Sequence, residues 1–157
     1  MSDFGARSTV RADCFLLADA VQEANGKLFV LGGGWDRLVL SGPETKAPPM
    51  ALACRIIVPW LDTNRLLRFL IHLQDSDGNE LLGNINIDIN VGRPPQLDPG
   101  ADQAIPLAIN LTDLVFQRQG TYAFKITHDD QDLARKIFMV AFSQDVQARP
   151  PSAPFAS

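Results

Sequence analysis

Alternation of apolar and polar residues with a period of two is the feature of this sequence that most constrains its fold. Every second residue is large and apolar over residues 67–73, and isoleucines alternate with polar residues over 83–91. Successive side chains of a β-strand point to opposite faces, so each run buries one face and leaves the other in water. No segment of similar length keeps an apolar stripe of helical period. The sequence therefore predicts a protein built of strands.

Seven further runs predict the remaining strands, which brings their number to eight or nine. They cover residues 13–18, 27–31, 35–40, 52–58, 105–111, 121–127 and 135–142. Many short strands separated by turns rich in Pro and Gly are typical of an all-β fold. We predict a single antiparallel β-sandwich, immunoglobulin-like or C2-like, with a flattened barrel as the alternative.

Turn residues predict how some of these strands are connected. Asn25-Gly26 and Asp77-Gly78 each lie between two alternating runs, which is a strong signal for a β-hairpin. Residues 18–24 have a second interpretation as a short helical turn. Three glycines at residues 32–34 interrupt an apolar run, so we expect a bulge or a corner of the sheet there.

The length of 157 residues and an apolar content of 46% predict one domain with a sizeable core. We expect this domain to span residues 11–143, between a flexible N-terminus at 1–10 and a flexible tail at 144–157 that is rich in Pro, Ala and Ser. The net charge of -4 gives no electrostatic reason to bind nucleic acid or an anionic membrane.

The compartment predicted from the sequence is the cytoplasm. No uninterrupted apolar run approaches the ~18 residues of a membrane span, and the first residues lack the apolar segment of a signal peptide. Cys14 and Cys54 have neither the number nor the spacing of a disulfide framework or a CxxC site. We expect buried thiols, and a single disulfide between them is the alternative.

Two segments carry a resemblance to known families. The sequence DCFLLADA at residues 13–20, followed by GKLFVLGGGWD at 26–36, resembles the opening of an uncharacterised bacterial domain family that is rich in β-structure. This resemblance implies an intracellular domain of unknown function and transfers no catalytic residue. Gly-x-Tyr-x-Phe at residues 120–124 is similar to the strand entry of immunoglobulin-like sandwiches, where the Tyr hydroxyl returns to the backbone.

Two acidic clusters are candidate metal sites. Asp75, Asp77, Asn79 and Glu80 present oxygen atoms at the spacing that begins a calcium loop, although Asn86 replaces its final bidentate Glu. The alternative is a plain hairpin turn. A second cluster around His128 could hold a divalent ion or form a soluble turn between two strands. It also contains Asp129, Asp130 and Asp132.

Two further groups are candidate binding surfaces. Asn84, Asn86, Asp88 and Asn90 form one face of a strand and could bind a sugar or a peptide if Trp35 or Trp60 lay beside them; otherwise they are a solvated sheet face. Trp35, Asp36 and Arg37 have the composition of an interface hot spot. The alternative places Trp35 at the edge of the core and pairs Asp36 with Arg37 at the surface.

No pattern in the sequence predicts catalysis or a cofactor. Only His72 and His128 could serve as an imidazole base, and no GxSxG, HExxH or P-loop motif is present. We therefore predict a non-enzymatic module that binds a protein partner or a second copy of itself. The alternative function is a sandwich that binds a small ligand, a carbohydrate or calcium.

Overall fold

The computed structural model describes residues 10–83 and 85–143 of the chain. Asn84, the predicted tail at 144–157 and most of the predicted N-terminal segment lie outside the described residues. Val10, the last residue of that segment, is buried.

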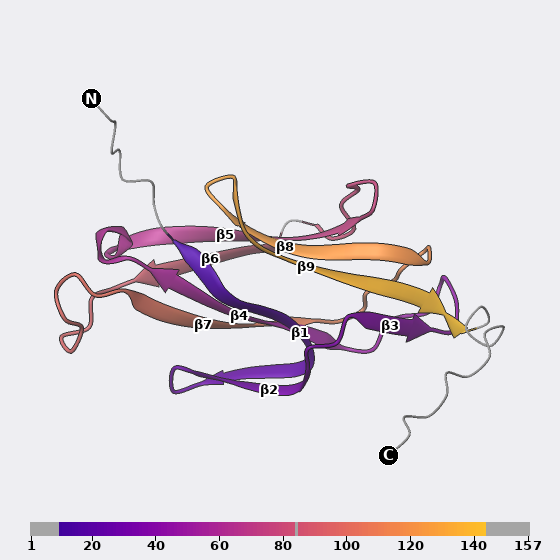
Figure 1. Ribbon diagram of the computed structural model, residues 1–157, viewed down its shortest axis with the longest axis horizontal. Coiled ribbons are helices and arrows are strands. Elements are labelled where there is room, and N and C mark those ends of the chain that lie inside the picture. The colour runs from indigo at the N-terminus through magenta and orange to yellow at the C-terminus, as the bar shows by residue number, and fades with distance from the viewer. Residues whose placement is uncertain (1–9, 84, 144–157) are drawn as a thin grey trace, which may run out of the picture.

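Nine strands and one short 3-10 helix form in the described residues, so the prediction of an all-β fold with eight or nine strands is confirmed (Figure 1). The elements are β1 (Arg11–Ala24), β2 (Lys27–Gly33), β3 (Arg37–Leu40), β4 (Met50–Val58), η1 (Trp60–Asp62), β5 (Arg65–Asp75), β6 (Ile85–Val91), β7 (Gln103–Leu111), β8 (Gly120–His128) and β9 (Gln131–Phe142).

The strands form two sheets that face each other across one core (Figure 1). Sheet A has the order β2-β1-β4-β7, and sheet B has the order β3-β9-β8-β5-β6. Every neighbouring pair is antiparallel except β3 and β9, which are parallel. The parallel pair arises because the chain leaves sheet A after β2 and joins the opposite sheet beside its last strand.

The predicted inward faces supply the core. Leu52, Cys54 and Ile56 of β4 are fully buried, as are Phe69 of β5 and Phe124 of β8. Phe138 of β9 joins several aromatic rings, since its ring lies 5.4–6.1 Å from those of Trp35, Phe116, Tyr122 and Phe124. Cys14 and Cys54 are both free thiols, and burial raises the pKa of Cys54 to about 12.

The helical interpretation of residues 18–24 is wrong, because these residues continue β1 and pair with β2. Asn25 and Gly26 have φ of 52° and 73°, the left-handed conformation that a two-residue turn of type I′ requires. Ala24 and Lys27 are paired on either side of that turn, so the predicted first hairpin is confirmed. Because the tight turn brings β2 back beside β1, β1 stays a paired strand up to its last residue, Ala24.

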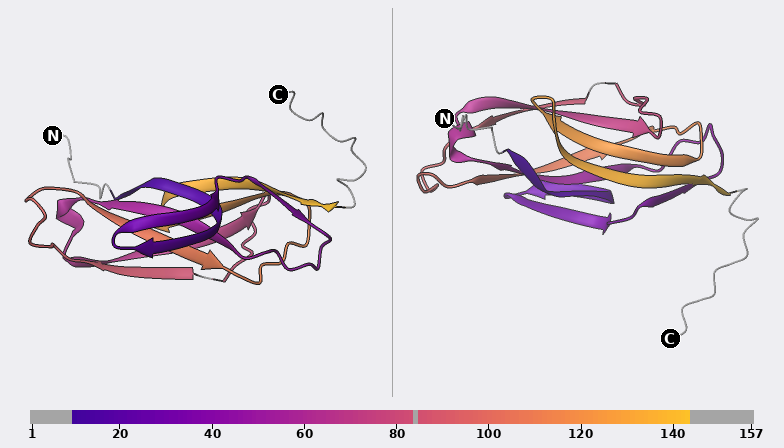
Figure 2. Two further views of the ribbon diagram at one scale, coloured as in Figure 1. Left: turned by 90° about the horizontal axis from the view of Figure 1, so that it is seen from below. Right: turned by 45° about the horizontal axis from the view of Figure 1, so that its top comes forward.

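The second half of β1 and all of β2 fold back over the outer face of sheet A (Figures 1 and 2). We call residues 19–33 the outer hairpin. Its Val21 side chain is buried in a small apolar cluster with Ala18, Ala51 and Ala53, and Ala108 packs against that cluster. These alanines lie on the outer face of sheet A. Their small side chains let the outer hairpin approach and form a third layer.

The single tyrosine forms the contact that its sequence context predicted. The Tyr122 hydroxyl donates a hydrogen bond of 2.6 Å to the carbonyl oxygen of Arg118, four residues upstream. Phe116 packs edge-on against the Tyr122 ring, with ring centroids 4.8 Å apart. The loop before β8 is therefore attached to the core through both its backbone and an aromatic side chain.

The described part of the chain contains no helix with the length and hydrophobicity that a membrane span requires.

We expect Tyr122→Phe to lower the free energy of unfolding by about 1 kcal/mol, because the Arg118 carbonyl loses its donor while ring packing is kept. Urea unfolding followed by circular dichroism measures this difference. Thr121→Ala, at the exposed neighbouring position of the same strand, is the control. An unchanged stability in Tyr122→Phe would show that this hydrogen bond contributes nothing.

We expect Ala53→Leu to destabilise the protein by about 1–3 kcal/mol, because the larger side chain takes the space under the outer hairpin. Amide hydrogen exchange should speed up in residues 19–33 before it does in the rest of the molecule. Ala104→Leu places the same side chain at an exposed position of β7 and should leave both measurements unchanged. Slow exchange of the hairpin in Ala53→Leu would contradict the packing described above.

Candidate functional site

A pocket of about 470 Å³ lies at the corner where the chain passes from sheet A to sheet B. Asp19 and Arg37 contribute opposite charges to its lining, and Trp35, Leu38 and Met50 contribute apolar surface. The structure thus brings two of the three predicted hot-spot residues, Trp35 and Arg37, to one concave surface. This combination suits a small ligand with an apolar body and charged groups.

The glycines of the corner are needed for its shape. A side chain at Gly32 would put its Cβ 2.3 Å from Asp19 Oδ2, and the residue has a φ of +61°. Gly34 has a φ of +89°, and its N–H donates to the Leu17 carbonyl at 2.7 Å. The predicted corner at residues 32–34 is therefore confirmed, and it brings the Asp19 carboxylate close to the backbone.

Trp35 is an anchor of this corner to the core. Its ring meets Phe138 edge-on, with the centroids 6.1 Å apart. Its Nε1 atom is buried and has no hydrogen-bond partner among the residues that the structure describes, so the indole N–H points away from solvent. The contact with Phe138 agrees with the interpretation of Trp35 as a residue at the core edge. The buried indole N–H is not accessible to a binding partner.

Asp36 and Arg37 act separately at the start of β3. The carbonyl oxygen of Asp36 accepts a hydrogen bond of 2.8 Å from the Met139 N–H, which continues the contact between β3 and β9. Both side chains are exposed, and in the described residues they form no ion pair with each other. The backbone of Asp36 thus has a structural role, whereas the Arg37 side chain is available at the pocket.

The polar face of β6 lies at the edge of sheet B and is exposed at Asn86, Asp88 and Asn90. Asp88 is bound by both guanidinium nitrogens of Arg68 that face it, at 2.8 and 3.1 Å. This hydrogen bonding holds the pKa of Asp88 below its usual value. The fourth residue of the predicted ladder, Asn84, lies outside the described residues. One of its three described members is thus already occupied within the sheet.

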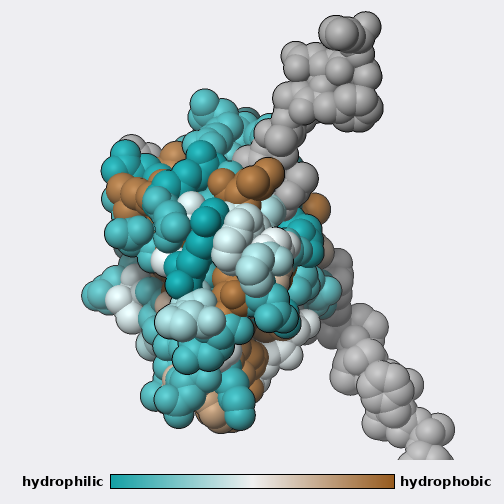
Figure 3. Space-filling model, turned by 90° about the vertical axis from the view of Figure 1, so that its left-hand side faces the viewer, coloured by the Kyte–Doolittle hydropathy of each residue, from teal (hydrophilic) through white to brown (hydrophobic). Residues whose placement is uncertain are grey.

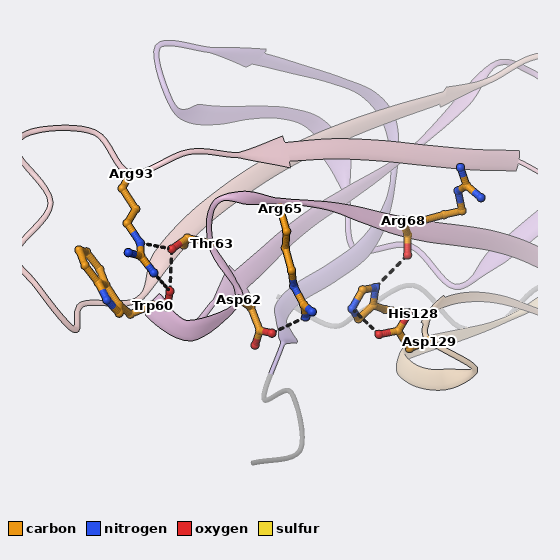
Figure 4. Close-up of polar contacts among 8 residues, drawn as sticks. All are labelled: Trp60, Asp62, Thr63, Arg65, Arg68, Arg93, His128 and Asp129. Atoms are coloured by element: carbon orange, nitrogen blue, oxygen red, sulfur yellow. Dashed lines mark hydrogen bonds and ion pairs between the residues drawn. The ribbon is translucent and has the colours of Figure 1, made fainter. Parts of the chain in front are cut away.

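Trp60 lies at the end of sheet B where β5 begins, and its ring is covered on one face by Arg93. The Arg93 guanidinium lies 4.0 Å from the ring centroid and donates to the Trp60 carbonyl at 2.9 Å. It also donates to Thr63 Oγ1 at 2.5 Å (Figure 4). Figure 3 shows the end of the molecule that carries η1, where apolar residues are scattered among hydrophilic ones. This tryptophan is held within a local polar network.

The predicted calcium loop is a tight turn with its oxygens engaged in hydrogen bonds. Asp75 Oδ1 accepts from the N–H groups of Asp77 and Asn79, both at 2.9 Å, and Oδ2 accepts from the Asn79 side chain at 3.1 Å. Glu80 points to His72 and Gln74 instead. The described residues contain no group of three or more His, Cys, Asp or Glu side chains placed to hold a metal ion. The contacts favour the hairpin-turn alternative.

His72 is the centre of a polar network that the sequence did not indicate. Its ring nitrogens lie 3.0 Å from Glu80 Oε1 and 3.1 Å from Thr127 Oγ1. A hydroxyl, an imidazole and a carboxylate in this order are the components of a catalytic triad. Acyl transfer also needs N–H donors aimed at the developing oxyanion, and the strand on either side of Thr127 is paired in the sheet. We interpret the network as structural.

His128 is buried at the end of β8, whereas Asp129, Asp130 and Asp132 beside it are exposed (Figure 4). The His128 Nδ1–H donates to the Arg68 carbonyl at 2.8 Å, and the imidazole stacks on Phe69 with centroids 5.0 Å apart. Nε2 lies 3.3 Å from Asp129 Oδ2 without forming a hydrogen bond. Asp129 and Asp130 both have positive φ and form the turn between β8 and β9. These contacts favour the interpretation of the second acidic cluster as a turn between two strands over its interpretation as a metal site.

The surface that sequence reasoning missed is β2, at the edge of sheet A. Phe29, Val30 and Leu31 are exposed large apolar residues that follow one another along this strand. They also line a second pocket, of about 500 Å³, together with Ala20, Val21 and Gln22. The uninterrupted run LFVL gives no such signal by itself, because a short continuous apolar run is also typical of a strand buried on both faces.

The Asp75 turn makes stability depend on pH in a defined direction. The hydrogen bond from the Asn79 side chain, followed by that from its backbone N–H, holds the Asp75 pKa below its ordinary 3.8. A carboxylate with a lowered pKa in the folded state stabilises that state above its ordinary pKa, and this contribution is lost as pH falls through the lowered value. We expect wild type to melt higher than Asp75→Asn at about pH 7, and the difference to shrink below about pH 4. Thermal melts across this range, with Asp77→Asn as the control, measure the effect; a difference independent of pH would contradict it.

Comparison with known proteins gives a family and no activity. No match was found among curated proteins. Among solved structures, an immunoglobulin-like protein from Pseudomonas aeruginosa shares 14% identity and a TM-score of 0.40 over 87% of this chain and 99% of its own. Alkylpurine DNA glycosylase AlkC from Pseudomonas fluorescens, solved with DNA containing an abasic site analogue, shares 13% identity and a TM-score of 0.42 over 85% of this chain. The match covers only 31% of the glycosylase chain.

One family model matches residues 13–141 and describes a family of unknown function, DUF6941. The match includes all of the strands from β2 to β8 and most of β1 and β9. The suspected resemblance to an uncharacterised family is thereby confirmed, and the chain belongs to the DUF6941 family of unknown function.

Proposed function

We propose that this protein is a non-enzymatic interaction module that docks an extended strand of a protein partner along β2. The observation that carries the proposal is the exposed apolar edge of the outer hairpin. Phe29, Val30 and Leu31 are 57%, 41% and 72% exposed, respectively. Three adjacent apolar side chains at a sheet edge are a feature of strands that pair with another chain.

The backbone of β2 also supports docking of a strand. Residues on an antiparallel strand alternately direct their N–H and C=O groups toward and away from the neighbour. Ala24 and Lys27 form the pair next to the two-residue turn, so Lys27, Phe29 and Leu31 face β1. By the same alternation, Leu28 and Val30 direct their N–H and C=O groups to the open side, whereas Gly32, with a φ of +61°, leaves the extended conformation. An added strand would find two residues ready to pair.

The other three edge strands carry features that oppose such pairing. β7 contains Pro106, which has no N–H to donate. β6 carries Asp88 and two amides on its exposed face, and β3 is only four residues long. Charges, proline and short length are the devices by which proteins protect sheet edges. In contrast, β2 has Lys27 at one end and no proline, which favours it as the docking edge.

The net charge and the two cysteines support a choice of partner class and compartment. A net charge of -4 favours a protein over nucleic acid or an anionic membrane. Both thiols are free, with Cys54 buried and Cys14 half-buried, and free thiols are typical of a reducing compartment such as the cytoplasm. We therefore propose a cytoplasmic protein partner or a second copy of the chain.

A second candidate function is binding of a small ligand in the corner pocket. It is favoured by the placement of Asp19, Trp35 and Arg37 around one concavity of about 470 Å³. A ligand present at about 100 times its dissociation constant adds about 2.7 kcal/mol to the stability. A thermal-shift screen with charged metabolites, glycans and calcium would detect that gain, and Arg37→Ala would remove it.

We expect affinity capture from the native lysate to recover a partner with wild-type protein and to lose it with Leu31→Lys. A lysine at this exposed position places a charge in the docking edge without removing a core residue. Leu61→Lys is the matched control, since Leu61 is an exposed leucine on η1, away from β2. Mass spectrometry identifies the recovered proteins, and circular dichroism checks the fold. Recovery of the same proteins with all three forms would contradict docking at β2.

A further inference from the structure

The two charged side chains of the corner pocket, Asp19 and Arg37, come from different sheets. Asp19 follows Ala18, the last residue of β1 that pairs with β4 in sheet A, and Arg37 begins β3 in sheet B. Strand pairing holds the backbone at both places, since Ala18 and Ala20 pair with β2 and Arg37 pairs with Met139 of β9. The pocket therefore presents one negative and one positive group from a backbone that is already fixed.

The two charges of the pocket are separate from each other. Asp19 and Arg37 are exposed, and within the described part of the chain neither forms an ion pair with the other or with a third residue. The Asp19 carboxylate lies against the backbone of Gly32, where a Cβ atom would come within 2.3 Å of Oδ2. A ligand in the pocket thus meets a carboxylate and a guanidinium as two distinct points of contact.

Most of the remaining lining is apolar. Met50 is buried, and Trp35 and Leu38 are half-buried. Pro48 and Pro49 are exposed and have φ angles fixed by their rings. The volume of about 470 Å³ falls within the ~300–1,000 Å³ of pockets that bind small molecules. The lining thus offers an apolar side chain a surface beside the two charges.

We propose that the corner pocket binds a free amino acid with an apolar side chain. Its ammonium group donates to the Asp19 carboxylate, which can accept several hydrogen bonds. Its carboxylate accepts from the Arg37 guanidinium, whose planar N–H groups match a carboxylate in two parallel hydrogen bonds. Its side chain covers the apolar lining at Trp35. This inference rests on the second candidate function, binding of a small ligand in the corner pocket, and is independent of docking at β2.

Charge distinguishes this ligand from other small molecules. A simple anion attracted by Arg37 meets the negative charge of Asp19 in the same pocket and that of Asp36, the exposed residue next to Arg37. A simple amine attracted by Asp19 meets Arg37. A neutral sugar leaves both charges without a counter-charge, and one end of a peptide partner supplies a single charge. A small zwitterion gains from both residues at once.

Two-dimensional NMR of the full chain with L-phenylalanine as the probe tests the proposal. The two tryptophans give two indole N–H signals, which Trp60→Phe assigns. Trp35 lines the pocket, whereas Trp60 follows the far end of β4, about 30 Å along that strand from Met50. We expect the Trp35 signal to shift with a dissociation constant of about 1 mM. The Trp60 signal is the internal control and should stay in place.

Three further compounds test which parts of the ligand are recognised. 2-Phenylethylamine keeps the ring and the ammonium group, and 3-phenylpropionate keeps the ring and the carboxylate. Each should bind at least about tenfold more weakly than L-phenylalanine, because one hydrogen bond between charged groups is lost. Glycine keeps both charges without the side chain and should also bind at least about tenfold more weakly. Equal binding of the three aromatic compounds would overturn the proposal.

Isosteric variants assign the two charges. Asp19→Asn keeps the shape of the side chain against Gly32, and we expect it to bind L-phenylalanine no better than 3-phenylpropionate. Arg37→Gln should bind L-phenylalanine no better than 2-phenylethylamine. Asp36→Asn changes an exposed neighbour that does not line the pocket and should keep the wild-type preference for L-phenylalanine. A full preference for L-phenylalanine in both pocket variants would overturn the roles given to these residues.

Failure of this inference is distinguishable from failure of the candidate function on which it rests. A Trp35 signal that does not move up to about 20 mM L-phenylalanine overturns the amino acid as the ligand. If the thermal-shift screen still finds a stabilising ligand whose effect is lost in Arg37→Ala, the pocket remains a site for another class of molecule. If neither experiment finds a ligand, both fail, while docking at β2 is judged by its own capture experiment with Leu31→Lys.

Discussion

The contact between the outer hairpin and the alanines of sheet A is the interaction on which the accessible surface of this protein depends. Ala18, Ala51, Ala53 and Ala108 leave the outer face of sheet A low enough for Val21 to pack there. Larger side chains at those positions would push the hairpin away, because tightly packed interiors do not absorb added volume. With the hairpin in place, β2 forms the free edge of sheet A, lying outside the sandwich. The exposure of Phe29, Val30 and Leu31 thus follows from the alanines of sheet A, which let the outer hairpin pack through Val21 and leave β2 at the edge.

The same arrangement explains the corner that follows β2. The chain must leave the outer layer and reach sheet B, and it does so within the glycines at 32–34 before pairing β3 with β9. Trp35 attaches this crossing to the core through Phe138. The crossing leaves a pocket between Asp19 and Arg37. Edge and pocket therefore adjoin each other, and both depend on the hairpin lying over sheet A.

Local patterns in the sequence predicted most of the strands, because strands such as β5 and β6 alternate buried and exposed residues and the tight turns contain Asn-Gly or Asp-Gly pairs. The hairpin at Asn25-Gly26, the corner at 32–34 and the hydrogen bond of Tyr122 all follow from a few adjacent residues. The folding back of the outer hairpin could not be predicted in this way, since it depends on alanines from three strands meeting at one place. The candidate site was missed for the same reason: the run LFVL reads as a buried strand until its neighbours are known. Trp35 and Arg37 were found, although the Trp35 N–H proved to be buried.

Selection of one edge for pairing requires that the others be protected. In this DUF6941 protein, Pro106 interrupts the donors of β7, Asp88 and its ion pair with Arg68 charge the edge of β6, and β3 is short. An apolar edge left open beside such protection costs free energy in the isolated chain, because its side chains and its N–H and C=O groups meet only water. Pairing of that edge recovers part of this cost, whereas pairing at a protected edge would bury a charge or leave a carbonyl without a donor. Under the proposed function, the contrast between β2 and the other edges would direct association to a single surface.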